Sequence, residues 1–130
     1  MQQLLVIFDS EISDAIFDES GEVVTPGGQS LAITLAQALR EHGFRVNEVV
    51  QRSFYGWEFE ISTGKHRFLA VLQQAESWLI AVGDTSHLFA RLTSRSSAHE
   101  LDRVAHALSD AVVATKSGTN VRIECPWGRG

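Results

Sequence analysis

Three consecutive β-type segments in the middle of the chain constrain the fold most. Residues 57–61 alternate between apolar side chains and glutamates, the pattern of a half-buried antiparallel strand. After a turn at residues 62–65, residues 66–72 are apolar on both faces, as expected of a central strand. A second turn at residues 73–76 precedes residues 78–82, which are apolar throughout. Short turns join antiparallel neighbours, so these segments predict a β-meander.

Two amphipathic helices are predicted on either side of this meander. In residues 28–42, leucines recur at four-residue spacing, and Gly43 follows where a left-handed residue ends a helix. The second helix is expected to begin at the capping box formed by Ser97 and Glu100. It should end near residues 116–118, where a lysine, a serine and a glycine follow the last apolar turn.

Further strand patterns occur at both ends of the chain. Residues 4–8 and 46–50 are rich in β-branched and apolar side chains, and residues 121–125 alternate between apolar and charged ones. Residues 15–25 have the composition of a hairpin with a tight turn. The apolar residues within 12–17 fit one turn of a helix equally well, so both interpretations stay open.

The element order predicts an α+β fold, because two strands per helix are too many for a doubly wound parallel sheet. We expect one mainly antiparallel sheet of about five to seven strands, with the two helices packed on one face. A chain of 130 residues suits a single domain, here residues 1–130. The predicted core residues lie on the apolar side of their elements: Leu35, Leu39, Phe59, Leu72, Trp78, Ile80, Val104 and Leu108.

Composition excludes several classes of function. The net charge of -5 and the isoelectric point near 5.4 argue against nucleic acid or an anionic membrane as the partner. Cys125 is the only cysteine, so a disulfide within the chain and a cysteine-based zinc site are excluded. The sequence shows no signal peptide and no apolar run long enough to span a bilayer. We therefore expect a cytoplasmic protein.

The negative charge is concentrated in residues 9–22, which contain six acidic residues and no basic one. The rest of the chain holds ten acidic and eleven basic residues and is almost neutral. An acidic cluster of this kind attracts a basic partner over long range. The predicted partner-binding residues are those of this segment, together with a tryptophan in the tail that is expected to be exposed or to cover a sheet edge: Asp14, Asp18, Glu19, Glu22 and Trp127.

His99, Asp102 and His106 form the strongest candidate for chemistry. Their spacing of three and four residues places them near one face of the second helix. Histidine and aspartate are suitable metal ligands, so a small ligand-binding or metal-binding enzyme that uses this face is the alternative function. The same residues fit the solvated side of an amphipathic helix, which is the preferred interpretation. We accordingly predict no catalytic residue, no metal site and no cofactor.

Three other features have structural explanations. Gly27 and Gly28 lack the lysine and the spacing of a nucleotide-binding loop, so they are interpreted as a chain break before a helix. Glu58 and Glu60 form an acidic ridge on one side of their strand and are expected to pair across the sheet with Arg67 on the next strand. Cys125 belongs to an apolar strand pattern and is predicted to be a small core residue.

The layout of residues 26–125 resembles small bacterial α+β proteins, including the immunity proteins of toxin systems. The resemblance depends on the glycine-opened helix GGQSLAITLAQALREHGF, the segment GWEFEI, the strand WLIAV and the late helix. It implies a protein that binds another protein and has no catalytic activity. Together with the acidic segment, it predicts an accessory or immunity-like binding protein with a basic partner.

Overall fold

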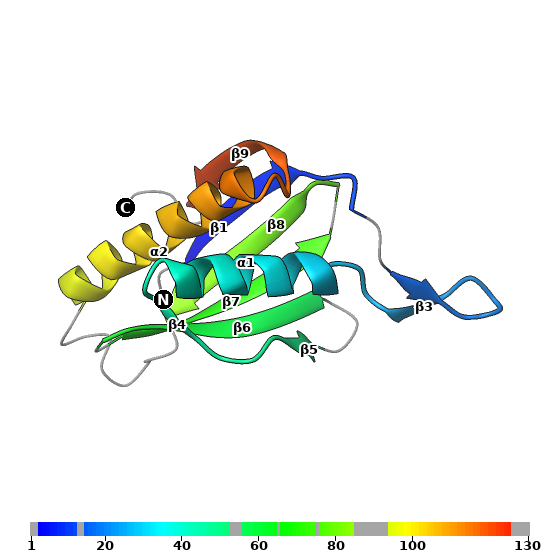
Figure 1. Cartoon of the computed structure of the whole chain (residues 1–130), viewed down its shortest axis with the longest axis horizontal. Helices are drawn as coiled ribbons and strands as arrows, with labels where there is room; N and C mark the ends of the chain where they lie inside the picture. The colour runs from blue at the N-terminus through cyan, green and yellow to red at the C-terminus, as the bar shows by residue number, and fades with distance from the viewer. Residues whose placement is uncertain are drawn as a thin grey trace.

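The computed structural model describes residues 3–12, 15–52, 56–64, 66–74, 76–84 and 94–125, and it has the predicted α+β architecture (Figure 1). Its elements in chain order are β1 (Gln3–Asp9), β2 (Ile16–Phe17), β3 (Val23–Thr25), α1 (Gln29–Glu41), β4 (Arg45–Val46), β5 (Val50–Arg52), β6 (Gly56–Thr63), β7 (His66–Gln74), β8 (Trp78–Asp84), α2 (Ser94–Ala114) and β9 (Thr119–Glu124).

The main sheet contains seven strands, and its strand pairs are antiparallel within the described residues. Strands β6, β7 and β8 form the predicted meander. The order is β4-β6-β7-β8-β1-β9, with β5 also beside β6. The first strand therefore lies inside the sheet, where Val6 is opposite Ile80 on β8 and Ile123 on β9. Strands β2 and β3 form a separate two-stranded sheet.

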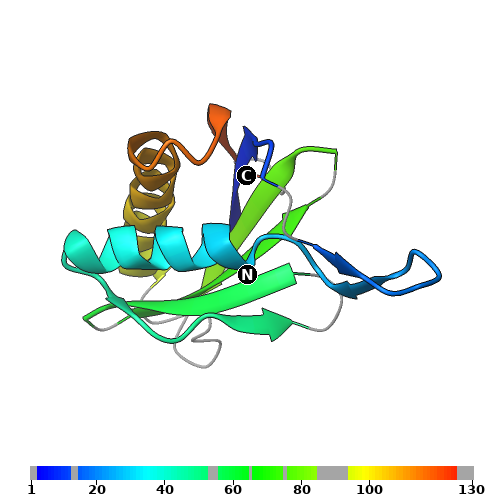
Figure 2. The same cartoon turned by 45° about the vertical axis from the view of Figure 1, so that its right-hand side comes forward.

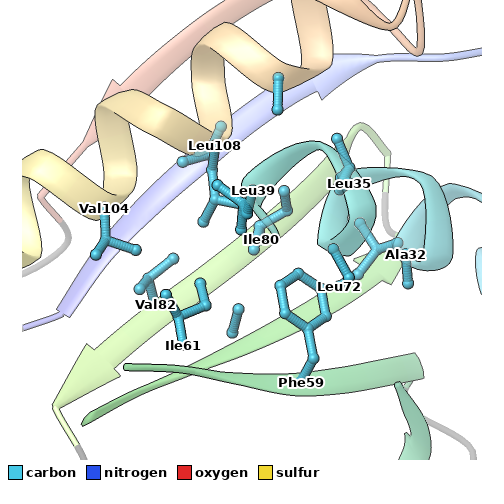
Figure 3. Close-up of a cluster of buried hydrophobic side chains, with 14 of the residues drawn as sticks. Ala32, Leu35, Leu39, Phe59, Ile61, Leu72, Ile80, Val82, Val104 and Leu108 are labelled. Atoms are coloured by element: carbon cyan, nitrogen blue, oxygen red, sulfur yellow. The ribbon is translucent and has the colours of Figure 1, made fainter. Parts of the chain in front are cut away.

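Both helices lie on the same face of the main sheet (Figure 2). The leucines of α1 and the apolar stripe of α2 meet the inward side chains of the strands in one continuous core (Figure 3). The predicted core residues are confirmed, because all eight are buried: Leu35, Leu39, Phe59, Leu72, Trp78, Ile80, Val104 and Leu108. This burial follows from the helical and strand periodicities, since each places apolar side chains on one side of its element.

Three of the four helix ends agree with those predicted from the sequence. Helix α1 begins after Gly28 and ends at Glu41, and Gly43 has the expected positive φ of 92°. Helix α2 ends at Ala114, just before the predicted closure. The prediction that α2 begins at Ser97 is wrong, because the helix begins one turn earlier, at Ser94. Residues 94–96 contain neither glycine nor proline, so nothing in them prevents the helix from extending.

Two predictions about single side chains are also wrong. Cys125 is exposed, because it follows the end of β9, an edge strand without a fully buried residue. Glu58 pairs with Arg52, whose Nη1 lies 2.7 Å from Glu58 Oε2, and not with Arg67. In the observed register Arg67 is opposite Ser62, four residues further along β6, which is about 13 Å away along the strand.

Candidate functional site

The hairpin formed by β2 and β3, residues 16–25, projects away from the body of the protein (Figure 1). We call it the hairpin arm. Ile16 is opposite Thr25 and Phe17 is opposite Val23, with an irregularity between the two pairs. The structure thus confirms the hairpin interpretation of this segment over the helical turn. The arm carries three of the predicted partner-binding residues, namely Asp18, Glu19 and Glu22.

Asp18 organises the turn at the tip of the arm. Its Oδ1 accepts hydrogen bonds from the backbone N–H groups of Ser20 and Glu22, at 2.9 and 3.0 Å, and from the Ser20 hydroxyl at 2.7 Å. The Ser20 hydroxyl, followed by the backbone N–H of Glu22, holds the pKa of Asp18 below its ordinary value. The carboxylate of Asp18 is therefore ionised and used within the turn. Glu19 and Glu22 are exposed, and neither side chain bonds to a described residue.

The strands of the arm expose apolar side chains. The exposed fractions are 56% for Ile16, 57% for Phe17, 41% for Val23 and 50% for Val24. These four residues make up most of the exposed large apolar side chains in the described part of the chain. Sequence reasoning did not identify them as functional, because an apolar residue in a strand pattern is normally assigned to a core. Their clustering next to the acidic turn defines the candidate interaction site.

The remaining acidic and aromatic candidates are not part of the arm as described. Asp9 lies at the end of β1, where its carboxylate accepts hydrogen bonds from Asn120 Nδ2 at 2.9 Å and Ser77 Oγ at 3.2 Å. These bonds, the one from Asn120 first, lower the pKa of Asp9 and tie it to the body of the protein. Asp14 and Trp127 lie outside the described residues. Asp9, at the start of the predicted acidic segment, is therefore a structural acid, whereas Asp18, Glu19 and Glu22 lie on the arm.

The predicted helix face on α2 opens onto a groove against the end of α1. Asp102 and His106 line this groove, whereas His99 is exposed and does not line it. His106 Nδ1 lies 2.8 Å from the carbonyl oxygen of Asp102 and 3.5 Å from its Oδ2. Sequence reasoning missed the contribution of α1, since His42 lines the groove from the opposite helix. Among the described residues, no group of three metal-ligating side chains comes together.

The glycines before α1 have a packing role. The carbonyl oxygen of Pro26 accepts a hydrogen bond from Trp57 Nε1 at 2.9 Å, which fixes the chain just before the helix. Gly28 has a φ of 113°, and a Cβ atom there would lie 2.9 Å from a ring carbon of Trp78. The conformation and the close approach both require glycine, in agreement with the interpretation of this segment as a chain break.

No known protein family, curated protein or solved structure matches this chain. The resemblance to immunity proteins therefore stays a prediction from the residue pattern. Neither of the two described helices has the length and apolar character needed to cross a membrane.

Proposed function

We propose that this protein is a non-catalytic protein-binding protein, of the accessory or immunity-like kind, and that its hairpin arm recognises a basic partner. The observation that carries this proposal is the pairing of four half-exposed apolar side chains with an acidic turn on one projecting element. The single cysteine suits a reducing compartment, so the proposal includes a location in the cytoplasm.

The apolar side chains of the arm supply the first part of the argument. A two-stranded hairpin is only marginally stable in water when nothing packs on it, and clustered exposed apolar side chains mark interaction surfaces. Removing the exposed half of Phe17 from water would stabilise a complex by roughly 1 kcal/mol. Ile16, Val23 and Val24 add comparable exposed surface on the same arm. Contact with a partner would remove these side chains from water.

The charge of the arm supplies the second part. Glu19 and Glu22 extend from the tip with no basic residue in the first 39 positions of the chain. Their field attracts a basic surface before contact, which raises the association rate more than the affinity. Asp18 adds its charge from within the turn. The arm therefore combines electrostatic attraction at its tip with apolar contact along its strands.

Affinity capture from the native host with matched variants tests this proposal. Wild-type protein is compared with Phe17→Ser, which removes an exposed apolar side chain, and with Val113→Ser, which changes an equally exposed apolar residue on α2. We expect a protein that is captured by the wild type and by Val113→Ser, and lost with Phe17→Ser. Equal capture by all three proteins would contradict a role for the arm.

Association kinetics with the captured protein test the role of charge. Glu19→Gln/Glu22→Gln removes two charges from the tip and keeps the turn-forming Asp18, whereas Glu41→Gln/Glu48→Gln removes two exposed charges elsewhere. The arm variant should associate roughly threefold or more slowly than the wild type at low salt. The difference should shrink at about 0.5 M salt, because salt screens exposed charges. If the arm variant associates at the wild-type rate at low salt, the acidic tip contributes only to solubility and does not attract the partner.

A further inference from the structure

The face of the main sheet opposite the two helices carries apolar side chains on its central strands. Successive side chains of a strand point to opposite faces, so the residues between the core residues of β1, β7 and β8 point to this second face. Both described helices lie on the core side (Figure 2), and we call the second face the open face. Its apolar residues are outside the core cluster: Leu5, Ile7, Leu69, Val71, Leu79 and Ala81.

The strand register arranges the open face in two neighbouring rows that cross the sheet. The first row runs from β6 to β9 and consists of Glu58, Val71, Ala81, Leu5 and Glu124. The second row lies two residues further along the strands and consists of Gln73, Leu79, Ile7 and Arg122. Arg52 of β5 lies at the other end of the second row, since it is opposite Gly56, two residues before Glu58.

The middle of the two rows is apolar although the helices do not cover it. An antiparallel sheet with one solvated face normally carries polar side chains on that face. Here Leu5, Ile7 and Leu79 are neighbours on adjacent strands, and each is partly exposed. A central place in the sheet explains apolar residues on the core side, but it does not require them on the open face. Contiguous apolar side chains on a solvated face mark a contact surface.

The ends of the two rows carry opposite charges. At the β9 end, the first row has Glu124 and the second has Arg122, and the two side chains are 51–54% exposed. At the other end, the first row has Glu58 and the second has Arg52, whose Nη1 lies 2.7 Å from Glu58 Oε2. Each end of the apolar strip therefore has an acid in the first row and a base in the second.

We propose that the open face binds the open face of a second copy of this chain, which gives a two-fold symmetric dimer of stacked sheets. A two-fold axis that runs across the strands, between the two rows, lays the first row of each copy over the second row of the other. Glu124 then lies opposite Arg122 of the second copy, and Glu58 lies beside Arg52 of the second copy. The apolar middles of the rows meet between these charges, in the aligned packing usual for two sheets.

The charges select this arrangement over the other symmetric one. A two-fold axis parallel to the strands would lay the first row on the first row with its ends exchanged. Glu58 would then meet Glu124 and Arg52 would meet Arg122, and like charges brought together across an interface oppose binding. The arm projects away from the body of the protein (Figure 1), so this inference does not rest on the proposed function of the arm.

Sedimentation equilibrium of the full-length protein tests the dimer. The wild type should show a reversible, concentration-dependent rise from the monomer mass of 14.3 kDa to twice that mass. Phe17→Ser, which changes the arm, should dimerise as the wild type does. A monomer at every concentration would overturn the proposal. Loss of the dimer in Phe17→Ser would overturn it as well, because the arm would then be the contact.

Charge reversal at the exposed β9 end tests the pairing. Arg122→Glu and Glu124→Arg should each weaken dimerisation by roughly tenfold or more, because like charges then meet across the interface. An equimolar mixture of the two variants should form a mixed dimer about as tightly as the wild type, since each supplies the charge that the other needs. Glu41→Arg reverses an exposed charge on α1 and should have no effect. Failure of the mixture to associate would refute the charge pairing.

Leu79 separates stacking of the open faces from pairing along the free edge of β9, in which Arg122 could also meet Glu124. Leu79→Ser removes a partly exposed apolar side chain from the middle of the open face and should weaken dimerisation by roughly tenfold. Val113→Ser, at an exposed position on α2, should leave dimerisation unchanged. Circular dichroism establishes that each variant is folded. A folded Leu79→Ser variant that dimerises like the wild type would exclude the open face as the interface.

Discussion

Substitution of Leu108 gives the most direct test of how the two helices pack on the sheet. It is fully buried on the apolar face of α2, and Figure 3 shows it beside Leu39 of α1, above the strands of the sheet. Replacing Leu108 with alanine removes three carbon atoms from the place where both helices meet the sheet. The backbone of α2 should be unaffected, because alanine is a strong helix former.

The expected loss of stability follows from two terms. At roughly 0.8 kcal/mol per buried methylene, three carbons contribute about 2.4 kcal/mol. Because the two helices and the sheet hold the vacated space open, a residual cavity of roughly 40 Å³ is expected. At ~24 cal/mol per Å³ this cavity adds about 1 kcal/mol to the loss of stability. Leu108→Ala should therefore lower the free energy of unfolding by about 3–4 kcal/mol, as measured by urea unfolding followed by circular dichroism.

Val113 provides the control on the same helix. It is 61% exposed, so Val113→Ala should change the free energy of unfolding by less than about 0.5 kcal/mol. A loss below ~1 kcal/mol for Leu108→Ala would refute the packing of α2 on the sheet, since every buried Leu→Ala substitution carries at least the transfer term.

Two further predictions concern the contributions of Gly28 and Asp9 to the stability of the fold. Gly28→Ala should cost about 2–4 kcal/mol in urea unfolding, because its Cβ atom would meet Trp78 at a positive φ. Gly43→Ala is the control, because Gly43 has a φ of 92° but an added Cβ atom would meet no atom within 4 Å, so the loss of stability should be only about 1 kcal/mol. Equal losses for the two variants would contradict the contact with Trp78 as the cause. The pKa of Asp9 is lowered from 3.8, so its contribution to stability is present above about pH 4 and is lost as pH falls through the lowered pKa. Asp9→Asn should therefore flatten the fall in melting temperature between about pH 5 and pH 2, and an unchanged slope would exclude this role.

The candidate site was predictable only in part. The acidic residues Glu19 and Glu22 were found from charge clustering, which is a property of the sequence alone. The apolar surface next to them was not found, because the pattern around Phe17 is the same for a strand in a core and for one on a projecting arm. The difference depends on what packs against the strand. Asp18 was counted among the partner-binding residues, but the structure shows that its carboxylate also builds the turn.

The groove between the helices shows the same division. Asp102 and His106 could be placed on one helix face, because i to i+4 spacing is local geometry. His42 is 64 positions away in the sequence from His106, and only the packing of α1 against α2 brings both to one groove. The resemblance and the composition contained nothing about this pairing.

The sequence by itself determined the two helices, the β-meander and the eight predicted core residues that are buried. These properties follow from local periodicity and from glycine conformation, which act over a few residues. The tertiary structure alone decided that β1 lies between β8 and β9, that Cys125 is exposed beyond an edge strand, and that Glu58 pairs with Arg52. Each of these depends on contacts between segments far apart in the chain. Such contacts are selected by the free energy of the whole packed arrangement, and no local pattern specifies them.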